Sequence, residues 1–146
     1  MPHAHAPAAA DAGTPLDTFH RCHVGIITQL NASSELAALA DAAMRARRVA
    51  QDTLKLFEEA VLPHHAEEEG ELFPAVLRSA LPDELEQVRT LVHQLTEEHR
   101  DVEAQWVLLA PAVKKVARGH EAEIDGPGMD ELIRRYLRHA RSEEQV

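Results

Sequence analysis

The sequence predicts an all-α protein with the architecture of an antiparallel up-down-up-down four-helix bundle. Apolar residues recur three and four positions apart over most of the chain, and the alternation typical of β-strands is absent. A histidine pattern occurs twice with nearly the same spacing, as one helical hairpin used twice would produce. Long helices joined by short loops favour antiparallel neighbours, which gives the bundle.

Capping residues, glycine and proline set the expected helix boundaries. A break is expected around residues 31–34, a kink or bulge just before the histidines at Pro63, and an interruption at Pro111. The glycine-bounded stretch 119–128 is the clearest loop. We expect helices over about residues 15–41, 43–70 with a short extra turn up to 74, 82–118, and 129 toward the C-terminus.

Composition bounds the domain organisation and the class of partner. Residues 1–14 are Ala, Pro and His without apolar periodicity, so we expect a disordered tail there and one bundle domain over residues 15–146. A net charge of −10 disfavours binding to nucleic acid or to anionic membrane surfaces. No apolar run approaches the roughly 20 residues of a membrane helix, and the N-terminus lacks a signal-peptide pattern. With the single cysteine Cys22 excluding a disulfide framework, a soluble cytoplasmic protein is expected.

The repeated pattern is a histidine followed about forty residues later by His-x-x-x-Glu. Residues at i and i+4 lie on the same side of a helix, so each pair projects an imidazole and a carboxylate in one direction. Four neutral imidazoles and two carboxylates suit iron, manganese or zinc better than calcium or magnesium, which prefer oxygen ligands. The two copies of the pattern are His23 with His65 and Glu69, and His99 with His139 and Glu143.

Apolar stripes distinguish core histidines from solvated ones on the two later helices. His99 lies in line with Leu95 and other apolar residues, and His139 continues a line through Tyr136, so both are expected in the core. His93 has charged and polar neighbours at the same spacings. It is therefore expected to face solvent.

Two earlier positions leave alternatives open. His20 and His23 both have apolar neighbours at helical spacing, and His23 is favoured. His64 and His65 pose the same choice, and Pro63 makes helical-wheel arithmetic unreliable there. His65 is favoured because apolar residues share its face, whereas glutamates follow His64.

With these residues in place, the sequence resembles the bacterial hemerythrin-like, or HHE cation-binding, family over about Pro15 to Val146. The segments that carry the resemblance are FHRCHVGI, HHAEEEGELFPAVL, EEHRDVE and HARSEE. The resemblance implies a non-haem centre of two iron ions, oxo- or hydroxo-bridged. The Glu-x-x-His spacing of ferritin-like di-iron bundles occurs nowhere in the chain. The residues that match the family's metal ligands are His23, His65, Glu69, His99, His139 and Glu143.

One departure from the family bears on function. Oxygen-carrying hemerythrins typically have two histidines one turn apart on the third helix, whereas Leu95 and Glu103 flank His99 here. Four core histidines instead of five leave an additional open coordination position, unless Glu103 coordinates. Whether Glu103 or Glu144 is a ligand is left open by the sequence.

The resemblance implies a protein that binds or senses a diatomic gas, O2 or NO, or that handles iron. The additional open position favours reactions of oxygen, peroxide or nitric oxide over simple reversible carriage. Whether the protein is an enzyme is left open. The alternatives are an iron donor for the repair of iron-sulfur centres, and a zinc-bound or metal-free interaction module.

Overall fold

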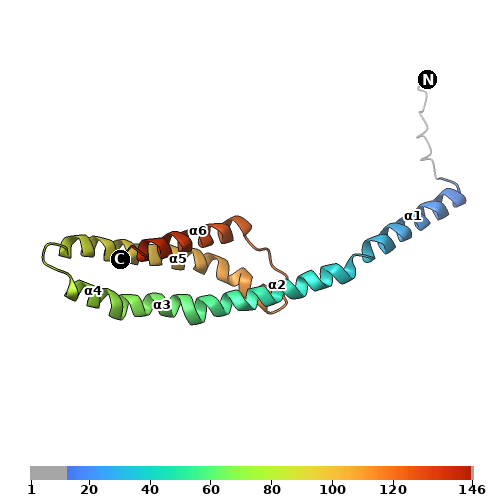
Figure 1. Ribbon diagram of the computed structural model, residues 1–146. Coiled ribbons are helices and arrows are strands. Elements are labelled where there is room, and N and C mark those ends of the chain that lie inside the picture. The colour runs from blue at the N-terminus through green and yellow to red at the C-terminus, as the bar shows by residue number, and fades with distance from the viewer. Residues whose placement is uncertain (1–12, 146) are drawn as a thin grey trace, which may run out of the picture. The chain divides into compact units, whose positions relative to one another are not determined.

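The computed structural model describes residues 13–145, and these contain helices, turns and one loop but no strand (Figure 1). This confirms the all-α class, with four successive helical segments formed by α1, the run from α2 to α4, α5 and α6. All of the predicted tail 1–14 except Gly13 and Thr14 lies outside the described residues, so the tail remains a prediction. The elements are α1 (Pro15–Ser33), α2 (Leu36–Leu56), the π-helical turn η1 (Phe57–Val61), α3 (Leu62–Glu67), the π-helical turn η2 (Glu68–Leu72), α4 (Phe73–Ser79), α5 (Leu85–Ala117) and α6 (Gly126–Glu143).

The chain divides into two compact units, Met1–Ala42 and Ala43–Val146, each described by itself. In the first unit, α1 starts where the sequence predicts because Thr14 and Asp17 form a capping box. The Asp17 N–H donates to the Thr14 hydroxyl at 3.2 Å, and the Thr14 N–H donates to the Asp17 carboxylate at 3.1 Å. The helix ends at Ser33, which confirms the predicted break around residues 31–34.

The boundary expected between residues 41 and 43 is wrong, because α2 is helical throughout Leu36–Leu56. The physical reason is composition. Residues 36–44 read LAALADAAM and contain neither glycine nor proline, and alanine, leucine and methionine are among the strongest helix formers.

The bulge expected before Pro63 is confirmed, and a second one precedes Pro74. In η1 the Leu62 N–H donates to the carbonyl of Phe57, five residues back, and a corresponding bond closes η2. Each proline sits in the first turn of the following α-helix, and the wider π turn accommodates its missing N–H and its bulky ring. Each π turn also inserts one residue into the helix, which rotates every later side chain relative to a regular wheel.

The interruption expected at Pro111 is absent, since α5 is one helix through this residue. Proline removes the hydrogen bond to the carbonyl four residues earlier, on Val107. That residue is 68% exposed, so its carbonyl can be hydrated. The helix then ends at Ala117, and two residues later Gly119 has a φ of 76°, which favours glycine; the His120 N–H donates to the Lys115 carbonyl at 2.9 Å.

The last helix starts three residues earlier than the predicted Met129. Asp125 caps α6 by accepting the N–H of Gly128 at 2.9 Å, and a first-turn proline follows the cap. The three helical segments of the second unit run antiparallel to one another in sequence order, with α5 packed against α6 and α4 (Figure 1).

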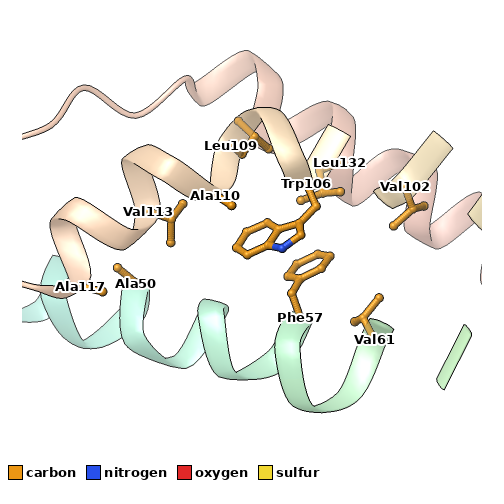
Figure 2. Packing of buried hydrophobic residues seen from close by; sticks show 10 residues of the cluster. All are labelled: Ala50, Phe57, Val61, Val102, Trp106, Leu109, Ala110, Val113, Ala117 and Leu132. Carbon is orange, nitrogen blue, oxygen red and sulfur yellow. The ribbon is translucent and has the colours of Figure 1, made fainter. Parts of the chain in front are cut away.

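An apolar core fills one end of the second unit. The rings of Phe57 and Trp106 stack with centroids 4.2 Å apart, and at the C-terminal end of α5 Gln51 donates to the Ala117 carbonyl at 3.0 Å. Trp106 is 4% exposed and belongs to this core. No helix in the described part of the chain is long and apolar enough to span a bilayer. Figure 2 shows the core residues Ala50, Phe57, Val61, Val102, Trp106, Leu109, Ala110, Val113, Ala117 and Leu132.

Candidate metal centre

Three histidines from three helices meet at the centre of the second unit. His65 of α3, His99 of α5 and His139 of α6 are each at most 2% exposed. Ring centroids are 3.9 Å apart for His65 and His99, and 4.5 Å apart for His99 and His139. Imidazoles this deeply buried need polar partners, because an unpaired buried polar group is costly.

Their Nδ1 atoms have such partners, and each partner is a carboxylate on another element. Because an ionised carboxylate only accepts hydrogen bonds, it favours the tautomer in which Nδ1 carries the proton. The distances are 3.1 Å from His65 Nδ1 to Glu103 Oε1, 2.7 Å from His99 Nδ1 to Glu69 Oε1, and 3.1 Å from His139 Nδ1 to Glu98 Oε2.

On the opposite side, the Nε2 atoms of His99 and His139 face two further carboxylates. Glu68 Oε2 lies 3.1 Å from His99 Nε2, and Glu143 Oε1 lies 2.6 Å from His139 Nε2 and 3.7 Å from His99 Nε2. Although close, these contacts lack hydrogen-bond alignment, so the three Nε2 atoms and these two oxygens are buried without a hydrogen-bond partner among the described residues. We call the set His65, Glu68, His99, His139 and Glu143 the inner cluster.

The inner cluster has the atoms and the spacing of a metal site. Ligand atoms of His65, His99 and His139 lie within 4.8 Å of one another, as do those of Glu68, His99, His139 and Glu143. Neutral imidazoles and carboxylates together are typical ligands of iron, zinc and other first-row metals. Cations placed in these two overlapping groups would give the unpartnered atoms the partners that they lack.

The electrostatics of the inner cluster agree with this interpretation. Burial, together with the charge of Glu143, raises the pKa of Glu68 from 4.5 to about 7. Burial and the neighbouring imidazole of His99 lower the pKa of His65, which favours its neutral, metal-binding form. Burial also tends to raise the pKa of Glu69, but hydrogen bonds from His99 and Arg100 outweigh it and lower that pKa.

The structure brings together four of the six residues that the sequence singled out: His65, His99, His139 and Glu143. Glu69 lies outside the inner cluster and is part-exposed. Its carboxylate contacts Nδ1 of His99 and the guanidinium of Arg100. Its neighbour Glu68 takes the inner position and is 6% exposed. The sixth residue, His23, lies on α1 in the first unit and is exposed, with Nδ1 3.1 Å from the Phe19 carbonyl. The predictions of Glu69 and His23 as ligands therefore stay predictions.

Local geometry explains why Glu68 was missed. Glu68 starts the π turn η2 and is three residues from His65 but four from His64, whose Nε2 contacts its Oε1 at 3.1 Å. The spacing His64-x-x-x-Glu68 was a visible signal in the sequence. Glu98 could not have been found in the same way, because its partner His139 lies on another helix.

A helical protein with a buried cluster of histidine and glutamate is, by fold and site, a metal-binding helical domain. The family model described as the hemerythrin HHE cation binding domain matches residues 14–146. The chain therefore belongs to the hemerythrin HHE cation-binding family, and its His/Glu cluster could hold a metal ion. No curated protein and no solved structure matches the chain.

Proposed function

We propose that this site holds two iron ions and that the centre takes a small ligand, O2, NO or peroxide. The observation that carries the proposal is the convergence of three unpartnered imidazole nitrogens and two carboxylates in a buried space. Calcium and magnesium are disfavoured by the nitrogen donors. Bound iron would supply an open coordination position and one-electron redox chemistry.

The two oxygens of Glu68 support a two-ion site. Oε2 faces Nε2 of His99 at 3.1 Å, and Oε1 faces Nε2 of His64 at 3.1 Å on the other side. A carboxylate with nitrogen donors on both sides is suited to bridge two cations. In this proposal His65, His99 and His139 would hold one ion, Glu68 and Glu143 would supply carboxylate ligands, and His64 would contribute to the second ion. A histidine of α1, with His23 favoured, stays the sequence-based candidate for a further ligand.

A neighbouring cavity supports a small and weakly polar ligand. A space of about 270 Å³ borders the inner cluster at Glu68 and Glu143. Most of its remaining wall is apolar and includes Leu72, Phe73 and Leu95. Such a space is large enough for molecules of the size of O2, NO or peroxide, and its apolar wall suits weakly polar ligands.

Optical spectroscopy during controlled oxidation tests this function. Protein loaded with Fe(II) without oxygen and then exposed to air or peroxide should develop the near-ultraviolet absorption of an oxo-bridged diferric centre. The His139→Ala variant should not, whereas His93→Ala should behave as wild type, because His93 is exposed. A wild-type protein that takes up only zinc, or that holds no metal, would instead favour the interaction-module alternative.

A further inference from the structure

Three glutamates outside the inner cluster each hold one of its histidines. Glu103 faces Nδ1 of His65, Glu69 faces Nδ1 of His99, and Glu98 faces Nδ1 of His139. We infer that Glu69, Glu98 and Glu103, here called the outer carboxylates, are positioning residues that aim the three Nε2 atoms at the metal. The inference deepens the proposed function and rests on it for the presence of a metal.

Each outer carboxylate belongs to a different element from the histidine that it contacts. Glu69 of η2 reaches His99 of α5, while Glu98 and Glu103 of α5 reach α6 and α3. A single proton position therefore follows for each ring, with N–H on Nδ1 and a lone pair on Nε2. All three lone pairs are in the buried inner cluster, where they have no other partner among the described residues.

The oxygens of the outer carboxylates that do not face a histidine are engaged as well. Arg100 donates to the second oxygen of Glu69 and, at 2.6 Å, to that of Glu103. Glu98 Oε1 accepts from Ser142 Oγ at 3.1 Å and from Gln94 Nε2 at 2.9 Å. These contacts hold the outer carboxylates on the Nδ1 side of the three histidines.

The arrangement predicts effects on metal affinity. A carboxylate that accepts a hydrogen bond from Nδ1–H makes Nε2 of the same ring a stronger metal ligand. Loss of such a partner typically weakens metal binding about ten- to hundredfold. Glu98→Ala and Glu103→Ala should therefore weaken binding of Co²⁺ by this factor. The Gln variants keep an acceptor and should lose less.

The first experiment reads the tautomers without metal. Long-range ¹H–¹⁵N NMR of the metal-free protein near pH 8 distinguishes Nδ1–H from Nε2–H imidazoles. Wild type should show three Nδ1–H histidines in the cluster. Glu98→Ala should change the tautomer of His139 only. Arg100→Ala should change the tautomer populations of His65 and His99 and leave that of His139 unchanged, because Arg100 contacts Glu69 and Glu103 but not Glu98. A merely structural role would not produce this selectivity.

The second experiment measures Co²⁺ affinity by competition with a chelator. The matched control is Glu97→Ala, next to Glu98 on α5 but exposed, and it should bind Co²⁺ as wild type does. Nε2–H tautomers in wild type would overturn the inference, as would Ala variants that keep all three tautomers and an affinity within about twofold of wild type. Neither readout uses iron, oxygen or NO. A protein that gives the expected tautomers and Co²⁺ affinities but does not bind iron or react with oxygen or NO would therefore count against the proposed function alone.

Discussion

Oε2 of Glu68 lies 3.1 Å from Nε2 of His99, while the adjacent Glu69 contacts Nδ1 of the same ring at 2.7 Å. Two consecutive glutamates thus contact opposite sides of one buried imidazole. Glu68 faces the inner cluster, and Glu69 faces Arg100. Neighbours in sequence therefore have different expected roles, and this difference can be measured.

Glu68→Gln should stabilise the metal-free protein at alkaline pH. Burial and the charge of Glu143 raise the pKa of Glu68 from 4.5 to about 7, so its contribution to folding is present below pH 4.5 and is lost as pH rises through about 7. One pKa unit corresponds to about 1.4 kcal/mol, so the ionisation of Glu68 should lower the free energy of unfolding of wild type by up to about 3 kcal/mol. Glutamine has no charge to bury. The melting temperature of the Glu68→Gln variant in the presence of a chelator should exceed that of wild type by several degrees at pH 8 and match it near pH 4.5.

The control for this experiment is Glu67→Gln, on the adjacent exposed residue. It should change the melting temperature little and by the same amount at both pH values. An advantage of Glu68→Gln that does not grow with pH would show that ionisation of Glu68 is not the cause.

Single histidine substitutions should separate the two proposed ion positions. His65→Ala removes one of the three converging Nε2 atoms and should abolish stoichiometric metal binding. His64→Ala removes only the contact on the far oxygen of Glu68 and should leave about one tightly bound ion, while His93→Ala should leave two. Elemental analysis after desalting measures all three. Equal metal loss in the three variants would contradict the assignment of faces.

Leu95→His should slow oxidation of the reduced protein. Leu95 is 2% exposed, lies one turn before His99 and borders the cavity beside Glu68, so an imidazole there can close an open coordination position. The control is Leu91→His, one turn farther along the same cavity wall. Stopped-flow spectroscopy after mixing with oxygen gives the rates. Wild-type protein that binds and releases oxygen over many cycles would contradict this reading and favour a carrier or sensor.

Phe57→Ala should destabilise the second unit through loss of packing on Trp106. Truncation of a buried phenylalanine costs about 3–5 kcal/mol, whereas Val107→Ala, at a site 68% exposed, should change stability by about 0.5 kcal/mol or less. Urea unfolding followed by fluorescence of Trp106, the single tryptophan of the chain, measures both. Similar losses in the two variants would contradict the described core.

Much of the fold could be predicted because the signals are local. Thr14 and Asp17 mark the start of α1, and Pro63 marks a bulge. The errors arose where local rules compete. Proline usually interrupts a helix, but α5 continues through Pro111, one turn after the exposed Val107, and the alanine-rich segment near residue 42 favours helix over a turn.

The site was predictable only where it depended on helical periodicity. His99 and His139 lie on regular helices, and the stripes correctly placed both in the core. Glu68 and Glu69 are three and four residues after His65, so both lie near its side of the helix, and helical spacing alone does not show that Glu68 is the more buried of the two. The contact between Glu98 and His139 joins residues 41 positions apart, and no spacing within one helix encodes it.

The most direct test of the central claim is the iron content per chain of wild type, Glu68→Gln and Glu69→Gln, measured after anaerobic loading with excess Fe(II) and desalting. We expect about two ions in wild type, because the inner cluster and His64 offer two neighbouring positions bridged by Glu68. Glu69→Gln should still bind close to two ions, since the glutamine carbonyl can accept the hydrogen bond from Nδ1–H of His99. Glu68→Gln should lose at least one ion. Two ions retained by Glu68→Gln together with loss from Glu69→Gln would contradict the account, as would wild-type protein without iron.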